Sequence, residues 1–234
     1  LVLTMGVDTQ ANRLEYEVVG HGQYGESWGI KRGFIMGRPD TPGVWARLDD
    51  IIQHVYKFKN GDLYEGPYLN GERHGDGATF TFANGNKYTG SFRHGQQEGQ
   101  GTFTWKDVAV YKGQWKADKR HGQGTFEYAS GDKYVGAWKN GLQNGKGIYY
   151  FASGDRYEGD YQMGARTGQG VCYYADGSRY SGSFVDGAQS GRGIFTWPSG
   201  AEYDGEWKDD LRDGQGNYRT QEGDVYEGGW SAGL

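Results

Sequence analysis

The sequence predicts a mainly β protein: an elongated single-layer antiparallel ribbon of tandem 23-residue β-hairpins, preceded by an N-terminal α+β segment with a three-strand meander and one helix. Three observations carry this prediction. Glycine supplies 44 of the 234 residues, well above its usual share of about 7%, and so disfavours helix. Aromatic residues reach 16% and can replace aliphatic residues in a core. Tyrosine and glycine also recur at a fixed period, which indicates a repeat architecture.

Composition divides the chain near residue 60. Residues 1–63 hold 15 of the 27 Ile, Leu and Val residues, whereas the 171 residues after them hold 30 of the 37 aromatic residues. We therefore predict two domains, an α+β segment over residues 1–60 and a hairpin array over residues 61–234.

The first domain begins with three segments of strand character. They run from Leu1 to Asp8, from Arg13 to Val19 and from Glu26 to Met36, and they fit a hairpin meander. Thr41-Pro42 then resembles a helix start, and apolar residues at helical spacing predict a helix from Pro42 to Val55. Residues 56–59, the turn at 60–61 and Tyr64 form the first hairpin of the array.

The array follows one 23-residue frame. Counting each recurring tyrosine as position 0, glycine lies at +2, +11 and +13 and an aromatic residue at +4, and positions +15, +17 and +20 are usually aromatic, aromatic and glycine. The spacings are 24 and then six times 23, giving seven full units and one partial unit. The tyrosines at position 0 are Tyr64, Tyr88, Tyr111, Tyr134, Tyr157, Tyr180, Tyr203 and Tyr226.

Alternation within one unit predicts a hairpin. Over residues 111–115 the aromatic rings and Gly113 share one face, with polar residues on the other, and residues 124–128 repeat this pattern. Gly113 and Gly124 leave room for rings to lie flat over the backbone. Residues 116–122 are expected to form a polar loop, and residues 130–132 a tight turn between units. Glycines at +7, +11 and +20 are assigned as turn formers.

The frame resembles the MORN repeat, whose signature is Tyr-x-Gly-x-Trp followed by Gly-x-Gly, over residues 64–234. Local departures include Val108 at +20, Asp118 and Asp210 at +7, and Thr220 at +17. The resemblance implies a non-enzymatic scaffold that binds a partner protein, a second copy of itself or a phospholipid surface. The aromatic face is the candidate binding site, formed by Tyr64, Tyr68, Tyr88, Phe92, Tyr111, Trp115, Tyr134, Trp138, Tyr157, Tyr161, Tyr180, Phe184, Tyr203 and Trp207.

The first sixty residues resemble the start of the nuclease domain of lambda-type phage terminase large subunits. Residues 5–10, 13–14, 25–28, 35–38 and 48–49 carry this resemblance. It implies a fold similar to RNase H, with Asp8 as a first-strand carboxylate that helps to hold two Mg²⁺ or Mn²⁺ ions. The family's other acids come from later strands, which the hairpin array replaces here, and one carboxylate cannot build a two-metal site. The alternative function is therefore a DNA-packaging endonuclease remnant without activity, and the segment is expected to cap the first hairpin.

Other groups with chemical potential favour structural roles. His74 and His121 share position +10 two units apart, too far to share a metal, so we expect solvated loop histidines. Each Gly-x-Gly opens a strand and not a helix, which argues against a phosphate loop. Cys172, at an aromatic position, is expected to fill the core. We predict no cofactor, no metal and no catalytic residue.

Charge narrows the class of partner. The net charge is −5, and the array carries 18 basic and 22 acidic residues, which disfavours nucleic acid and weakens the case for anionic phospholipid. Residues 64–156 carry net +3 and residues 157–234 net −7. This gradient fits either chance drift on a solvated face or oriented docking. A single cysteine and the lack of a long apolar run favour a cytoplasmic protein, with peripheral membrane attachment as the alternative location.

Overall fold

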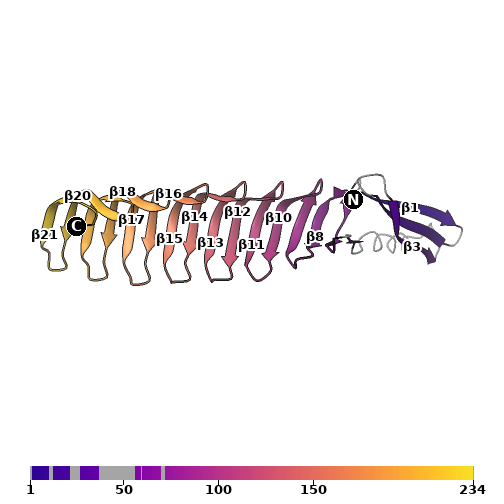
Figure 1. Cartoon of the computed structure of the whole chain (residues 1–234), viewed down its shortest axis with the longest axis horizontal. Helices are drawn as coiled ribbons and strands as arrows, with labels where there is room; N and C mark the ends of the chain where they lie inside the picture. The colour runs from indigo at the N-terminus through magenta and orange to yellow at the C-terminus, as the bar shows by residue number, and fades with distance from the viewer. Residues whose placement is uncertain are drawn as a thin grey trace. The chain divides into compact units, whose positions relative to one another are not determined.

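The computed structural model describes residues 2–10, 13–21, 27–36, 56–58, 60–69 and 72–233. The chain divides into two compact units, Leu1–Gly101 and Thr102–Leu234. Figure 1 shows strands throughout the described part of both units. Among the described residues, no helix is long and apolar enough to cross a membrane.

The first unit opens with the predicted meander. Strands β1 (Val2–Gln10), β2 (Arg13–His21) and β3 (Ser27–Met36) form a three-stranded antiparallel sheet in the order β1-β2-β3. This confirms the three strands expected from the sequence. The helix predicted from Pro42 to Val55 lies outside the described residues.

The first hairpins of the array complete this unit. Strand β4 (Tyr56–Lys57) pairs with β5 (Leu63–Glu65), as predicted, and β5 pairs with β8 (Gly75–Thr81), which pairs with β9 (Lys87–Arg93). The short strands β6 (Tyr68–Leu69) and β7 (Glu72–Arg73) form a separate pair. Strand β10 (Gln96–Trp105) contains the division between the units.

The second unit is a run of antiparallel hairpins. Its strands are β11 (Ala109–Lys116), β12 (Lys119–Tyr128), β13 (Lys133–Lys139), β14 (Leu142–Tyr150), β15 (Arg156–Gln162), β16 (Ala165–Tyr173), β17 (Arg179–Val185), β18 (Ala188–Thr196), β19 (Glu202–Lys208), β20 (Leu211–Arg219) and β21 (Val225–Trp230). Each strand pairs with its neighbours in sequence, in one 16-stranded sheet that includes strands of the array from β4 onward. The predicted open antiparallel ribbon is confirmed.

The turns within repeats are tighter than the sequence suggested. The polar loop expected over residues 116–122 is wrong, because β11 and β12 leave only Ala117 and Asp118 between them. Both residues have positive φ, 48° and 61°, as the two central residues of a type I′ hairpin turn require. Asp118, a departure from glycine at +7, therefore adopts the same left-handed conformation as glycine does there in other repeats.

The +11 glycines do not form turns, which corrects the role assigned to them. Gly122, with φ of 61°, lies inside β12, where the register between β11 and β12 shifts after Gly113. The shift is a β-bulge in β12. Residues that the sequence analysis assigned to a loop therefore belong to this strand and its bulge. Glycines at +20 do lie in tight turns: Gly131 has φ of 97° and donates its N–H to the Tyr128 carbonyl.

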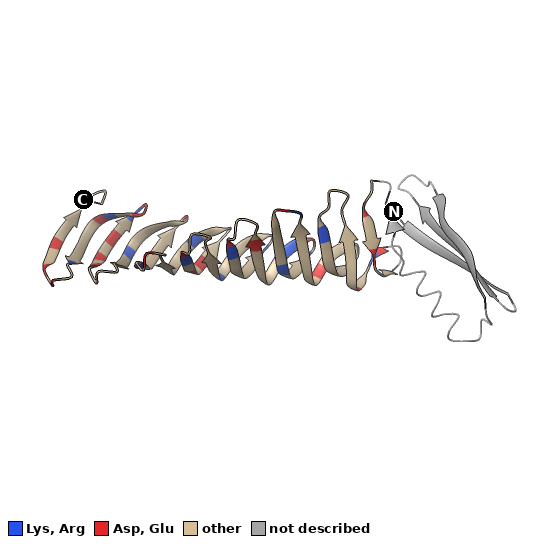
Figure 2. Ribbon diagram, turned by 90° about the horizontal axis from the view of Figure 1, so that it is seen from below, with Lys and Arg blue, Asp and Glu red and all other residues tan. Residues whose placement is uncertain are grey.

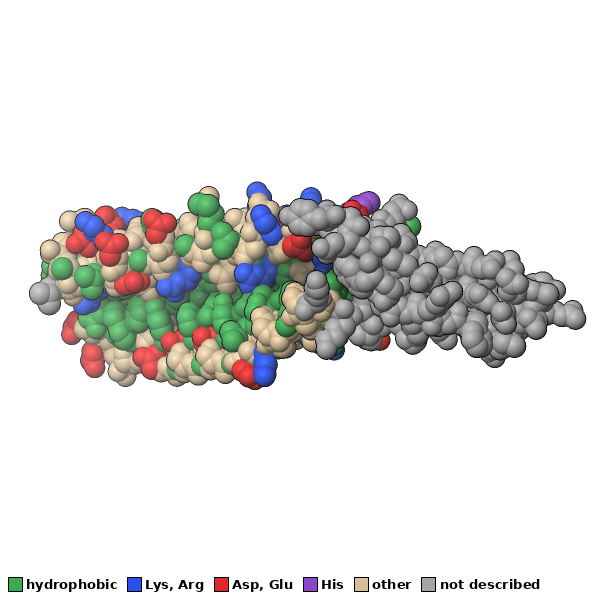
Figure 3. All heavy atoms as spheres, turned by 45° about the vertical axis from the view of Figure 1, so that its right-hand side comes forward, with side chains coloured by type: hydrophobic (Ala, Val, Ile, Leu, Met, Phe, Trp, Pro, Cys, Tyr) green, Lys and Arg blue, Asp and Glu red, His purple; other side chains and the backbone are tan. Residues whose placement is uncertain are grey.

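Two faces of this sheet differ in composition. The ring face, represented in one repeat by Tyr111, Trp115 and Phe126, carries buried aromatic side chains. The opposite face, represented by Lys112 and Gln114, is mostly polar. Figure 3 shows hydrophobic side chains gathered in a band along the repeats. The core of the array is this layer of rings.

Candidate interaction surface

The six position-0 tyrosines from Tyr88 to Tyr203 each lie flat over a pair of glycines on neighbouring strands, whereas Tyr64 and Tyr226 each lie over one glycine, Gly66 and Gly228. Gly136 and Gly147 are directly paired in the sheet, and a Cβ added to Gly147 would lie 2.5 Å from Cε2 of Tyr134. The Tyr134 hydroxyl donates a hydrogen bond to the carbonyl of Ala137, at 3.0 Å. The glycines therefore act as seats for the ring, as the sequence predicted.

The hydroxyl contact recurs through the array. In every repeat the tyrosine donates to the backbone carbonyl three residues later, at 2.9–3.2 Å. Because the hydroxyl has a partner inside the protein, a phenol can be buried here without the cost of an unsatisfied polar group.

Rings at 0 and +4 interlock between repeats. Tyr134 is T-shaped to Trp138 of its own repeat, with centroids 5.2 Å apart, and to Tyr161 of the next repeat, at 5.1 Å. The same pair of contacts joins Tyr157 to Tyr161 and to Phe184. Such edge contacts stabilise aromatic clusters beyond area burial alone.

This packing removes the predicted binding rings from solvent. The seven position-0 tyrosines that belong to the predicted set are 0% exposed, and their +4 partners are buried, apart from half-buried Tyr68. The buried partners are Phe92, Trp115, Trp138, Tyr161, Phe184 and Trp207. A partner molecule cannot reach the seven tyrosines and reaches the buried +4 rings only at their margins, so the accessible surface of the ring face has to come from other residues.

A second set of aromatic residues supplies that surface. These outer rings occupy +15 and +17 in the second unit, where only Phe126 among the aromatic residues is buried. The others are half-buried or exposed: Phe103, Trp105, Tyr128, Tyr149, Phe151, Tyr174, Phe195, Trp197 and Tyr218. Tyr128 is 37% and Phe151 36% exposed. The alternation of the second strand placed these rings on the ring face, but only the structure shows that they remain more accessible than the rings at 0 and +4.

The outer rings are in contact along two stretches. The ring centroid of Tyr149 lies 6.4 Å from that of Tyr128 and 4.5 Å from that of Phe151. In the later repeats, the ring centroid of Phe195 lies 5.7 Å from that of Tyr174 and 4.6 Å from that of Trp197. Cys172 occupies the +15 position between the stretches, where it is buried, and burial raises the pKa of its thiol. A buried thiol with a raised pKa is inert, which agrees with the predicted filler role.

Arginine at +9 of every second repeat ties the turn of the following repeat to its own repeat. Arg120 donates from Nη2 to the carbonyl of Gly141, at 2.7 Å, and its guanidinium lies 4.4 Å from the ring centroid of Trp138. Burial lowers the pKa of Arg120. Arg73, Arg166 and Arg212 make the equivalent hydrogen bond to the next turn. Gln97, Gln143 and Gln189 alternate with the arginines at this position, a two-repeat pattern that the sequence reading missed.

The histidines and acids lie as follows. His74, which was expected to lie too far from His121 to share a metal with it, has its ring centroid 5.4 Å from that of His94. His94 Nδ1 is 3.2 Å from a Glu72 carboxylate oxygen. In the described ranges no three His, Cys, Asp or Glu residues are grouped as metal ligands would be. Asp8 lies on β1, paired in register with Glu15 on β2.

Comparisons with known proteins agree with the repeat geometry. The MORN repeat family model matches residues 64–87, 88–107, 111–133, 134–156, 157–179, 180–202 and 203–225. The chain belongs to the MORN repeat family. The terminase large subunit gpA endonuclease domain matches residues 1–65. The terminase large subunit of Escherichia phage lambda is 44% identical over 59 residues, which are 25% of this chain and 9% of that protein.

Two solved structures show limited similarity to this MORN-repeat chain. The TCP10 domain of Danio rerio CPAP, in complex with a Danio rerio STIL peptide, aligns with a TM-score of 0.48 and 8% identity, over 97% of this chain and 100% of that one. A streptogramin B lyase aligns with a TM-score of 0.17 and 11% identity, over 97% of this chain and 73% of that one.

The buried phenols predict a loss of stability in alkali. Burial raises the pKa of Tyr111 to about 12 and also raises that of Tyr134, whereas unfolded tyrosine titrates near 10. The folded state thus retains protons that the unfolded state releases. Stability is complete below about pH 10 and decreases as the pH rises through about 12. Urea unfolding at about pH 8 and about pH 11 checks this, and we expect a lower free energy of unfolding at the higher pH. Tyrosinate absorbance follows the ionisation of the phenols in the same samples. An unchanged free energy of unfolding at the higher pH would contradict it.

Proposed function

We propose that this chain is a non-enzymatic interaction module that binds a protein segment through the outer rings of its MORN array. The observation that carries this proposal is the division of the aromatic residues into two sets. The predicted rings at 0 and +4, apart from Tyr68, are buried in the core of the array. The outer rings are held in fixed positions, and about a third of the surface of Tyr128 and Phe151 is exposed. Rigid, partly exposed aromatic side chains bind with little loss of conformational entropy and are enriched at protein interfaces.

We propose that the array works without metal or cofactor, and that the protein acts in the cytoplasm or at the periphery of a membrane. Self-association through the same rings is the nearest alternative within this function. Sedimentation velocity at several concentrations distinguishes the two, because a self-associating chain increases in mass as its concentration rises.

A peptide selection tests the proposal. The full chain is used to select binders from a displayed peptide library, and affinities are compared for wild type and Tyr128→Ser/Phe151→Ser. We expect selected peptides to lose at least about tenfold in affinity, since two partly buried rings are removed. Leu142→Ser, at the first residue of β14 and with 48% exposure, is the control and should leave affinity unchanged. Failure to enrich any peptide, or equal affinity for the ring variant, would contradict the proposal.

A phospholipid surface is the second partner class. The second unit turns acidic toward its C-terminal end, where Figure 2 shows Asp and Glu on several strands, and residues 157–234 carry net −7. Anionic lipid should be repelled from that end. We therefore expect no co-sedimentation with phosphatidylserine vesicles at physiological salt. Sedimentation of most of the protein with the vesicles would move the proposed partner from protein to membrane.

The N-terminal match favours one other candidate function. Residues 1–65 match a terminase endonuclease domain, so a metal-dependent DNA endonuclease remnant is the second proposal. The chain spans only 9% of the lambda subunit's length. We expect no DNA cleavage with Mn²⁺ or Mg²⁺, because a two-metal site requires more than Asp8. Cleavage that disappears in Asp8→Ala would establish the nuclease instead.

A further inference from the structure

The opposite face of the second unit carries a ladder of alternating cationic and aromatic side chains. Residues on neighbouring strands are paired directly in the order Lys133, Tyr150, Arg156, Tyr173 and Arg179, from β13 to β17. We call these five residues the cation–tyrosine ladder. Direct pairing at each step places them in one row across the strands, parallel to the axis of the array.

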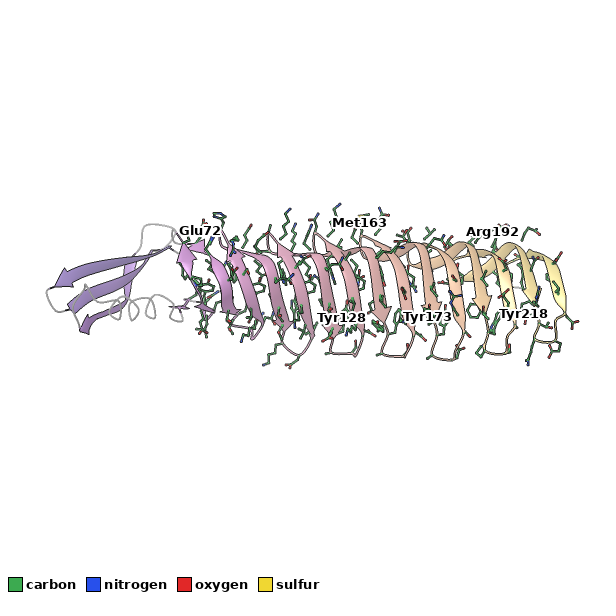
Figure 4. The ribbon with its side chains drawn as sticks, turned by 180° about the vertical axis from the view of Figure 1, so that it is seen from behind. Glu72, Tyr128, Met163, Tyr173, Arg192 and Tyr218 are labelled. Carbon is green, nitrogen blue, oxygen red and sulfur yellow. The ribbon has the colours of Figure 1, made fainter. Side chains whose placement is uncertain are left out.

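Stacking on Tyr173 joins the two arginines of the ladder. The Arg156 guanidinium lies 4.2 Å from the ring centroid of Tyr173, and that of Arg179 lies 5.7 Å from it on the neighbouring strand. Tyr150 is 38% exposed. Figure 4 shows Tyr173 toward the edge that carries the turns between repeats, opposite the edge of Met163. Stacked cations of this kind keep their hydrogen-bond donors free at the ring margins.

Acidic residues bound the ladder and partly neutralise it. Glu127 precedes Lys133 in the row, at 3.4 Å between the charged atoms, and Arg156 lies 3.8 Å from Glu158. The side chains of both pairs are 37–56% exposed, so these pairs contribute little stability and can yield to another carboxylate. Arg179 forms no ion pair with any residue in the described ranges.

An open groove of about 640 Å³ runs beside the ladder on the same face. Val135, Ile148 and Val171 line it together with Tyr173, and the backbone of paired glycines forms part of its floor. Lys146, which also lines the groove, forms an ion pair with Asp160, with 2.9 Å between the charged atoms. A ligand would thus meet apolar surface in the groove, together with Lys146 and with Glu158, the ion-pair partner of Arg156, and cations along the ladder.

The spacing of the ladder selects a backbone conformation for that ligand. Lys133, Arg156 and Arg179 lie on every second strand, so neighbouring cations are about 9.6 Å apart. A bound β-strand presents side chains on the same face every two residues, about 6.8 Å apart, so its side chains would not keep the spacing of the ladder cations. A polyproline II segment repeats every three residues, about 9.3 Å, and matches both the cations and the tyrosines between them.

We propose that the groove and the cation–tyrosine ladder bind an acidic, proline-rich peptide segment in the polyproline II conformation, with a carboxylate at every third residue. The carboxylates pair with the ladder cations, and the prolines pack on Tyr150, Tyr173 and the valines of the groove. Tyrosine-lined grooves suit such segments because their backbone is already ordered before binding. This site lies on the face opposite the outer rings and goes beyond the function proposed above.

Fluorescence anisotropy with the full chain and a labelled peptide (Glu-Pro-Pro)₃ tests this. We expect saturable binding that weakens with salt and weakens at least about tenfold in Arg156→Gln/Arg179→Gln. Arg192→Gln, on the same face outside the ladder, should bind as wild type. A peptide of the same composition with its three glutamates adjacent should bind at least about fivefold more weakly.

Three results would overturn the proposal: no binding at millimolar protein, equal binding of the two peptide isomers, or equal binding by the double arginine variant. Circular dichroism shows that each variant is folded before titration, and the single variant Arg179→Gln serves if the double variant is not. Because none of these residues belongs to the outer rings, failure here leaves the ring-face proposal to its own test.

Discussion

Gly147→Ala is expected to destabilise the second unit by about 3 kcal/mol or more. The new Cβ would lie 2.5 Å from Cε2 and 2.6 Å from Cζ of Tyr134, distances that carbon atoms do not tolerate. The Tyr134 ring cannot move away from the new Cβ, because its hydroxyl donates a hydrogen bond to the Ala137 carbonyl and the ring packs in T-shaped contacts with Trp138 and Tyr161. Overpacking a rigid core by one carbon commonly costs 1–3 kcal/mol, and more where the neighbours are fixed.

Urea unfolding followed by circular dichroism measures this effect. Gly229→Ala is the matched control, since only Gln215 Nε2, at 3.7 Å, would approach its Cβ, and we expect a change below about 0.5 kcal/mol. In a Tyr134→Ala background the clash is absent, so Gly147→Ala should cost less than about 1 kcal/mol. Equal costs of Gly147→Ala in both backgrounds would show that the ring does not rest on the glycine.

Trp138→Ala is expected to cost about 3–5 kcal/mol. Trp138 is 4% exposed, donates from Nε1 to the Gly124 carbonyl and lies edge-on to Tyr111 and Tyr134. Its removal leaves a large cavity and an unsatisfied carbonyl. The Arg120 guanidinium, which stacks on this ring at 4.4 Å, also loses its partner.

The control for Trp138→Ala comes from the outer rings. Phe151→Ala removes a ring that is 36% exposed and packs on Tyr149, so we expect a cost of about 1 kcal/mol. The two variants delete side chains of the same class on the same face. Similar free energies of unfolding for both would contradict the division between core rings and outer rings.

The sequence predicts the repeat, the two strands of each unit and the seating of rings on glycine. These follow from a fixed period and from alternation, which act over a few residues. The two-residue turn at 117–118 could not be predicted from period and alternation. Asp118 stands where other repeats have glycine, and the bulge at Gly122 interrupts the alternation that would mark where β12 begins. Polar residues over 116–122 are equally typical of a loop.

The candidate surface was less predictable than the fold. Period and alternation assign Tyr134 and Tyr149 to the same face, but burial depends on how successive repeats pack, which is a contact between residues distant in sequence. The cation–tyrosine ladder also needs the register: Arg156 and Arg179 are 23 residues apart and meet Tyr173 from its two neighbouring strands. A sequence signal does exist for the +9 position, where Arg and Gln alternate.

Hydroxyl-radical footprinting of the intact protein, read residue by residue by mass spectrometry, tests the division of the rings most directly. Met163, 73% exposed, provides an internal reference for full reactivity. We expect rapid modification of Tyr128 and Phe151 and protection of Tyr134 and Trp138, at 0% and 4% exposure. Modification of Tyr134 and Trp138 at the same rate as Tyr128 would contradict it.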